Sequence, residues 1–317
     1  MAEIGKDISH ARALLEGGDL VAIPTETVYG LAGNALDPDS VAKIFETKNR
    51  PHFDPLIIHV PDFDHVDKYV SQMPAKAILL AQKFWPGPMT MVMKKRSHVP
   101  DLVSAGLETI GIRCPDHDLT RELLRSLAFP LAAPSANPFG YVSPTTAQHV
   151  DDQLGQKIKY ILDGGPCPIG IESTIVGFEG DNVVIYRMGG VTVEAIESIV
   201  GRVGIHTHST SNPKAPGQLH SHYAPGKKIL LGNISELVAA HRSEKIGIIS
   251  FQKRYTKDFN IVLSKAGSLQ EAAKSLFSAL REVDKMPVDL VITELVPDHG
   301  LGRAINDRLK RASQIKL

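Results

Sequence analysis

Cysteine is scarce in this chain of 317 residues, which contains only Cys114 and Cys167. The two cysteines stand far apart and in no C-x-x-C spacing, so the sequence predicts neither a disulfide framework nor a structural zinc site. We expect two reduced thiols in a cytoplasmic protein and no metal held by protein side chains.

An excess of charge is also missing, since Lys plus Arg and Asp plus Glu are 35 each. No overall field therefore attracts the chain to nucleic acid or to a membrane surface. No apolar run approaches the length of a membrane span, and residues 1–18 lack the apolar segment of a signal peptide. We expect no membrane partner, and any anion site must be local.

The common nucleotide and hydrolase signatures are absent as well. The sequence has no G-x-x-x-x-G-K-[ST] loop, no G-x-G-x-x-G after its first predicted strand, no H-E-x-x-H and no G-x-S-x-G. If the chain binds ATP, it does so without a P-loop.

The pattern of apolar residues predicts two α/β domains joined by a linker, in agreement with the length of the chain. Residues 204–227 are rich in His, Ser and Pro and show almost no apolar periodicity, so they are the predicted linker. Residues 1–203 are predicted to form a mixed sheet with flanking helices, and a helix is expected to start at Ser143-Pro144, with Ser as N-cap. The predicted strands of this domain are residues 20–23, 56–60, 90–93, 109–113, 130–133, 159–162, 174–176 and 183–186.

Residues 228–317 form the predicted second domain. Strands expected at 229–231, 246–249, 261–263 and 290–292 alternate with helical stretches at 235–241, 268–283 and 303–312. Such alternation is typical of a small, mostly parallel α/β sheet.

Two short motifs predict an anion site. Lys48-Asn49-Arg50-Pro51 follows a predicted helix, and Pro134-Ser135-Ala136-Asn137 follows a predicted strand. Cations and neutral donors could converge there on one phosphate. Each motif alone has an ordinary explanation, because cations complement a helix C-terminus and Pro, Ser and Asn favour turns. Arg113 ends a buried strand, which indicates an anionic partner, and we interpret it as a clamp for a carboxylate.

Read together with Pro24-Thr25-Glu26-Thr27-Val28-Tyr29-Gly30-Leu31, these motifs resemble the YrdC-like family of L-threonylcarbamoyladenylate synthases, in the longer form with an extra C-terminal domain. The segment 133–145 looks like the nucleotide loop of that family. The resemblance implies a concave cavity on a YrdC-like twisted sheet, a Rossmann-like second domain, and a linker that lies over the active site.

The resemblance also implies a reaction. ATP, L-threonine and bicarbonate or CO2 would give threonylcarbamoyl-AMP and pyrophosphate, the first step of t6A formation at position 37 of tRNA. Mg²⁺ would arrive with ATP, and the product would pass to a tRNA threonylcarbamoyl transferase. No side chain is expected to act as an obligatory nucleophile. Because carboxylate, carbamate and triphosphate share one pocket, several separate cations are expected.

The site residues follow from the matching positions. Lys48, Arg50, Arg113 and Ser135 are the expected catalytic residues. The expected threonine site contains Thr25, His59, Arg113, Ala133 and Ser173. The expected ATP site contains Lys48, Arg50, Asp54, Thr109, Ser135, Asn137, Ser143, Arg187 and Tyr223.

Two alternatives stay open. One is a related enzyme that adenylates another small amine through a carbamoyl or acyl group. The other is an RNA-binding protein without enzymatic activity, although net neutrality argues against strong binding of this kind and allows only weak RNA contacts.

Overall fold

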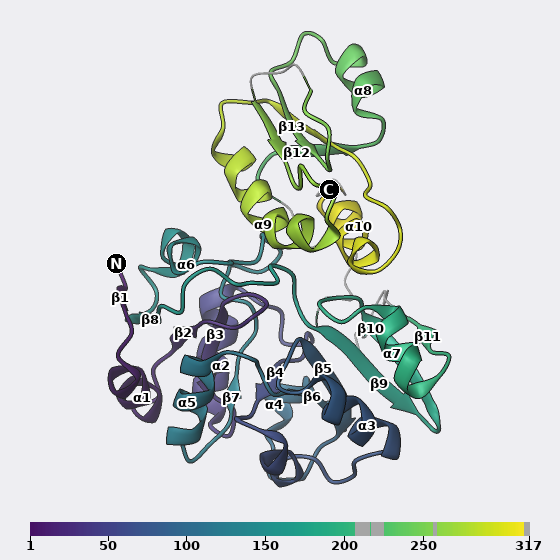
Figure 1. The fold of residues 1–317 in the computed structure, drawn as a ribbon. Coiled ribbons are helices and arrows are strands. Elements are labelled where there is room, and N and C mark those ends of the chain that lie inside the picture. The colour runs from purple at the N-terminus through teal and green to yellow at the C-terminus, as the bar shows by residue number, and fades with distance from the viewer. Residues whose placement is uncertain (207–215, 217–224, 256–258, 314–317) are drawn as a thin grey trace.

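The computed structural model describes residues 1–206, 216, 225–255 and 259–313 (Figure 1). It has two parts. The first is built on a sheet of eleven strands, and the second on a separate parallel sheet of four strands, among the described residues. The mixed α/β fold with a small C-terminal α/β domain that the sequence predicts is confirmed.

The large sheet has the strand order β1-β8-β2-β3-β7-β4-β6-β5-β9-β10-β11. It is mixed, because β4 pairs with β6 in parallel while β5 and β6 are antiparallel. Strand β11 adds residues 204–205 to this sheet, although they fall in the predicted linker. The strands are β1(Glu3–Gly5), β2(Val21–Ile23), β3(Gly30–Asn34), β4(Ile57–His59), β5(Met89–Lys94), β6(Thr109–Arg113), β7(Leu131–Ala132), β8(Tyr160–Leu162), β9(Thr174–Glu179), β10(Asn182–Arg187) and β11(Gly204–Ile205).

Helices cover both faces of this sheet. The main apolar core contains the buried sides of α2, α3, α6 and α7, and a second core on the opposite face contains those of α1 and α5. The helical elements of this domain are α1(Ile8–Glu16), α2(Pro38–Lys48), the 3-10 turn η1(Phe63–Lys68), α3(Ala75–Phe84), α4(Asp101–Ser104), α5(Asp118–Ser126), α6(Ala147–Leu154) and α7(Val193–Val200).

Strand alternation decides which side chains leave the main core. Successive residues of a strand point to opposite faces. Ile58 and Ile112 lie in the main core, whereas their neighbours His59 and Arg113 line a cavity on the other face. His59 and Arg113 are register partners on β4 and β6, so the sheet itself brings them together.

Arg187 reaches the same face through an irregularity. The β9–β10 register shifts between Ile185 and Arg187, so one residue of β10 is unpaired there. Ile185 lies in the main core, and a regular strand would turn Arg187 towards it as well. A bulge of this kind re-aims the following side chain, and Arg187 lines the cavity.

The prediction of a helix start at Ser143-Pro144 is wrong. Helix α6 begins at Ala147, and its N-cap is Thr146, whose side chain accepts a hydrogen bond from the backbone of His149. The earlier segment is committed to other partners, because the carbonyl of Pro144 accepts from the backbone N–H of Tyr29 at 2.9 Å. Ser143 therefore does not stand at a helix N-terminus.

The second domain has a parallel sheet of order β12-β15-β13-β14, covered on both faces. Helices α9 and α10 lie on the side towards the first domain, and α8 lies on the other side (Figure 1). The elements are β12(Lys228–Leu231), α8(Ile234–Ala240), β13(Ile246–Ser250), β14(Phe259–Val262), α9(Leu269–Lys285), β15(Leu290–Thr293) and α10(Leu301–Ala312).

The two domains share one apolar core. Val28, Val142 and Ile171 of the first domain belong to the same buried cluster as Leu276 and Phe277 of α9. Burial of continuous apolar surface of this kind holds two domains in one arrangement.

Arg281 of α9 adds polar contacts to this interface. It is buried, and its guanidinium donates to the carbonyl oxygens of Val142, Ser143 and His149. Burial lowers the pKa of Arg281 to about 10, so it remains a cation at neutral pH. The backbone at 142–143 is therefore held by a charged donor from the other domain.

Gly170 packs against α9 of the second domain and gives a test of how the two domains dock. It has φ +81°, and a Cβ there would lie 2.5 Å from Cα of Lys274 on α9. Gly180 has φ +60° but no atom within 4 Å of such a Cβ. Both substitutions place an alanine at positive φ, so Gly180→Ala should lose about 1 kcal/mol of unfolding free energy. The Cβ at position 170 also clashes with the backbone of α9, so Gly170→Ala should lose about 3 kcal/mol.

Urea unfolding of the two variants measures this difference. Equal losses would mean that the contact between residue 170 and α9 does not limit the packing.

Candidate functional site

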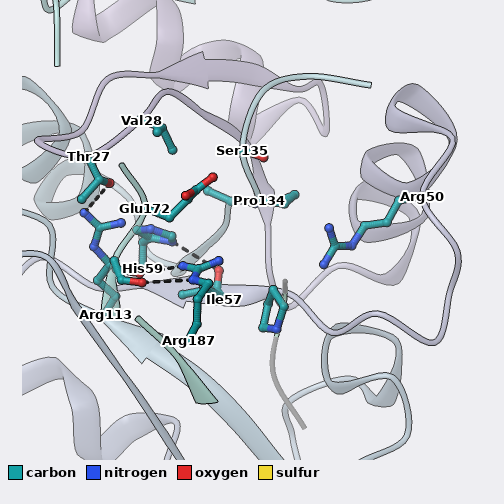
Figure 2. Close-up of a pocket in the computed structure, with 13 residues that line it drawn as sticks. Thr27, Val28, Arg50, Ile57, His59, Arg113, Pro134, Ser135, Glu172 and Arg187 are labelled. Carbon is teal, nitrogen blue, oxygen red and sulfur yellow. Dashed lines mark hydrogen bonds between the residues drawn. The ribbon is translucent and has the colours of Figure 1, made fainter. Parts of the chain in front are cut away.

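A cavity with about 530 Å³ of space, part of it open solvent, lies on the face of the large sheet opposite the main apolar core. Figure 2 shows that its labelled side chains come from several strand ends and loops and point into one space. The lining residues are Thr27, Val28, Arg50, Ile57, His59, Arg113, Ala133, Pro134, Ser135, Glu172, Ser173, Arg187 and Pro216.

Arg113 is held firmly on one side of the cavity. Its Nη2 donates to Oγ1 of Thr27 at 2.9 Å and lies 2.7 Å from Oε2 of Glu26. Glu26 and Arg113 are each about 5% exposed, so the ion pair is little screened. The Nε of Arg113 is buried without a hydrogen-bond partner in the described part of the chain. A buried donor without a partner, in a cavity wall, suits an anionic ligand.

Thr25 and Thr27 have different positions. Thr25 turns its hydroxyl to its own loop, where it donates to the carbonyl of Val28 at 2.6 Å. Thr27 lines the cavity and contacts Arg113 directly. Thr27 was not predicted from the sequence, and its only signal was the repeat Thr-x-Thr in the motif.

His59 is a neutral group in this cavity. Burial lowers its pKa to about 3, and the nearby positive charge of Arg113 acts in the same direction. Its Nδ1 lies 3.2 Å from the carbonyl of Ile57. His59 can therefore offer a neutral hydrogen bond to a ligand next to the charge of Arg113.

Lys48 supports the loop of Ser135 and does not line the cavity. Its Nζ donates to the carbonyl oxygens of Ser135 and Asn137, both at 2.5 Å. Lys48 is buried, and burial lowers its pKa well below the usual lysine value, with the charge of Arg50 adding to the effect. Asn137 also shapes the loop, since its Nδ2 donates to the carbonyls of Pro138 and Tyr141.

Arg50 lines the cavity from the side opposite to Arg113 (Figure 2). Its Nη2 lies 2.9 Å from Oδ2 of Asp54 and donates to the carbonyl of Pro55. Burial raises the pKa of Asp54, while Arg50, Lys48 and Arg187 lower it. Asp54 does not line the cavity. It was predicted to belong to the ATP site, and in the structure it pairs with Arg50, which does line the cavity.

Ser173 and Arg187 form a bonded pair in the cavity wall. Arg187 donates from Nη2 to Oγ of Ser173 and from Nε to its carbonyl, both at 3.0 Å. The hydroxyl of Ser173 also lies 2.8 Å from that of Thr90. Glu172, the residue before Ser173, lines the cavity as well and was not predicted from the sequence.

The four remaining expected site residues differ in position. Thr109 begins β6, at the opposite end of the strand from Arg113. Ser143 donates from Oγ to Oε1 of Glu172 at 2.6 Å, and Ala133 lines the cavity. Tyr223 lies outside the described residues. Pro216, which belongs to the predicted linker, does line the cavity.

Among the described residues, the cavity wall offers cations and hydroxyl groups, a combination suited to anions. Three arginines line it, together with hydroxyls and loop backbone. Cys114 and Cys167 are buried, and burial raises the pKa of each to about 12. Within the described residues, no three His, Cys, Asp or Glu side chains gather as metal ligands do, and none of the described helices has the length and apolar character needed to cross a membrane.

Comparisons with known proteins agree with this geometry. Residues 13–189 match the Sua5/YciO/YrdC family model, described as "Telomere recombination", and residues 191–314 match "Threonylcarbamoyl-AMP synthase, C-terminal domain". Threonylcarbamoyl-AMP synthase of Pyrococcus abyssi is 39% identical, with 97% of this chain and 94% of the relative covered. The Bacillus subtilis enzyme of the same name is 38% identical, with 96% and 92% covered.

Solved structures of P. abyssi Sua5 are similar over nearly the whole chain. The crystal structure of P. abyssi Sua5 complexed with L-threonine has a TM-score of 0.93 and 38% sequence identity. The match covers 99% of this chain and 97% of that one.

The neutral state of His59 gives a pH prediction. Its pKa of about 3 in the folded state lies below that of an unfolded histidine, so the unfolded chain binds more protons between these values. The contribution of neutral His59 to the unfolding free energy is therefore present at neutral pH. It is lost as the pH falls below the pKa of the unfolded histidine. His59→Asn should therefore reduce the rise in unfolding free energy between about pH 5 and about pH 7.5 by about 2 kcal/mol.

Urea unfolding at the two pH values measures this rise. Burial likewise lowers the pKa of His149, to about 4, so His149→Asn is the matched comparison and should also reduce the rise. A rise unchanged by His59→Asn would show that folding does not lower the pKa of His59.

Proposed function

The chain belongs to the Sua5/YciO/YrdC family in its threonylcarbamoyl-AMP synthase form, and from this premise we propose how the cavity divides its work. The reaction combines ATP, L-threonine and bicarbonate or CO2 to give threonylcarbamoyl-AMP and pyrophosphate. The proposal assigns the side of Arg113 to threonine and its carbamate, and the side of Arg50 and Ser135 to the nucleotide.

The convergence of three arginines from three separate segments carries this proposal. Arg50 follows α2, Arg113 ends β6 and Arg187 ends β10, yet all three line one cavity. The substrates bring a carboxylate, a carbamate and a triphosphate, so a cavity with several separately supported cations suits them better than a single cluster would.

The threonine side rests on Arg113. Its guanidinium is fixed by Thr27 and Glu26, and its buried Nε is ready to donate. A carboxylate at Arg113 would leave the amine near neutral His59 and the hydroxyl of Ser173. The similar P. abyssi protein has been solved with L-threonine, which supports a threonine site in this fold.

The nucleotide side rests on the loop that Lys48 holds. Ser135 presents its hydroxyl to the cavity, and Lys48 is buried directly behind that loop. Negative charge favours the protonated form of an amine. A triphosphate on this loop would therefore raise the pKa of Lys48 and favour its charged form while the nucleotide is bound. Arg50 and Arg187 would take the phosphates from either side.

The chemistry requires positioning more than covalent help. The neutral threonine amine adds to CO2 and loses a proton, or displaces water from bicarbonate, to give a carbamate. A carbamate oxygen then attacks the α-phosphate as pyrophosphate leaves. Arg113 would fix the threonine carboxylate while Arg50 and Arg187 balance the negative charge that develops on the phosphates. Pro216 at the cavity wall supports the proposal that the linker, including Tyr223, covers the bound substrates and excludes water.

Mg²⁺ fits the proposal as a companion of ATP. Glu172, the acidic side chain that lines the cavity, is paired with an arginine, and Glu26 and Asp54 behind the wall are paired as well. These residues suit an ion that keeps its waters and binds mainly to phosphate oxygens. When bound, the ion would supply charge neutralisation at the triphosphate. We also propose that the product passes to a tRNA threonylcarbamoyl transferase.

Pyrophosphate release tests the activity. Purified protein is mixed with ATP and Mg²⁺, with and without bicarbonate, and with L-threonine, L-serine, glycine or no amino acid. Release that requires both bicarbonate and L-threonine, with threonylcarbamoyl-AMP found by mass, is the expected result. Release with a different amine would favour another adenylating enzyme, and RNA affinity without release would favour an RNA-binding role.

Arg113→Ala tests the division of labour. Loss of a charge-assisted contact should raise the KM for threonine by about 10- to 100-fold and leave the Kd for ATP within about threefold. The KM follows from pyrophosphate release at varied threonine, and the Kd from calorimetry. The matched control is Arg12→Ala, which removes an exposed arginine paired only with a neighbour on α1. An equal loss of affinity for threonine and ATP would refute the assignment.

A further inference from the structure

Arg308 of the second domain reaches the wall of the cavity. It lies on α10, and its side chain is 0% exposed. Its Nε donates to Oε2 of Glu172 at 3.0 Å, its Nη1 to Oδ2 of Asp307 at 2.7 Å, and its Nη2 to the carbonyl of Met188 at 2.9 Å. One planar guanidinium therefore connects α10 with two segments of the first domain.

These two segments carry residues of the proposed site. Glu172 precedes Ser173, and Met188 follows Arg187, which itself donates to Ser173. The segments are packed without space between them, because a Cβ on Gly189 would lie 2.2 Å from the carbonyl oxygen of Glu172. A displacement of Glu172 or Met188 would therefore move Ser173 and Arg187.

Glu172 connects Arg308 with the nucleotide loop as well. Its Oε1 accepts from Ser143 at 2.6 Å, while its Oε2 accepts from Arg308. Each oxygen of this carboxylate thus has its own partner, one from each domain. Figure 2 shows the side chain of Glu172 among the residues that surround the cavity.

The negative charge of Glu172 is unfavourable for the binding of anions in this cavity. A carboxylate about 6% exposed in the wall of an anion site repels the substrates unless a cation balances it. Arg308 supplies that cation, and Asp307, which also accepts from Arg311 at 3.0 Å, fixes its orientation.

We propose that Arg308 is a positioning residue of the active site, through which the C-terminal domain aligns Ser173 and Arg187 and neutralises Glu172. The proposal rests on the proposed function, and it assigns the second domain a direct part in substrate binding.

Arg308→Met tests the proposal because it keeps the length of the side chain but removes the charge. The KM for ATP should rise by about tenfold or more, since the carboxylate of Glu172 is left without a cation beside the phosphates. Adding Glu172→Gln to the same protein removes that charge, and the KM should return to within about threefold of the original value. The folded fraction of each variant is measured by urea unfolding.

A purely structural role predicts a different result. The variants would then lose stability, and the folded protein would keep its KM. An unchanged KM in folded Arg308→Met, or a raised KM that Glu172→Gln does not lower, overturns the proposal. Should Arg308→Met not fold, Arg308→Lys replaces it in the same comparison, with an expected rise of about threefold because an ammonium reaches fewer of the three acceptors. No rise there overturns the proposal equally.

Lys285→Met is the matched control. Lys285 on α9 also pairs across the domains, with Asp152 on α6 at 2.7 Å, but its side chain is 71% exposed and lies away from the cavity. The KM should not change in this variant. The original protein must first produce threonylcarbamoyl-AMP, and failure at that step refutes the proposed function and not the role of Arg308.

Discussion

Positive charge in a buried space has to be balanced locally, and this constraint organises the protein around its cavity. Arg50 is paired with Asp54, Arg113 with Glu26, and Arg308 with Glu172. An arginine without such a partner would have a large desolvation cost. The pairs are placed so that each cation keeps a face towards the cavity or supports a neighbour that does. The proposed anion site is therefore formed before a ligand arrives, which would reduce the reorganisation that binding requires.

The sheet makes this arrangement possible by separating two environments. Along β4 and β6, alternate residues enter the main apolar core, and their neighbours face the cavity. His59 and Arg113 are adjacent because β4 and β6 are in register there. Arg187 is an exception to simple alternation, because the shift in β10 re-aims it. A side chain that balances charge can thus be placed by regular strand geometry or by a local departure from it.

The sequence predicts the regular parts of this structure better than the contacts between them. Strand β6 was predicted with its observed bounds, 109–113, because β-branched residues alternate there. Strand β3 was missed because Gly, Ala and Asn are weak strand formers. Packing nevertheless requires glycine at position 33, because a Cβ there would lie 2.6 Å from the side chain of Ser40. Helix α5 was also missed.

Some residues of the candidate site could likewise be predicted from the sequence, and others could not. Arg50, Arg113, Ser135 and Ser173 stand in recognisable motifs, and all line the cavity. Glu172 and Thr27 gain their significance from Arg308 and Arg113, which are 136 and 86 residues away. A pairing over such distances leaves no periodic signal in one sequence. Helix packing then explains why two buried arginines of the second domain reach the first: the carbonyls of Val142, Ser143 and Met188 face α9 and α10, and carbonyls at a buried contact need donors. Arg281 and Arg308 meet that need, so the surface that joins the domains also fixes the loops of the cavity.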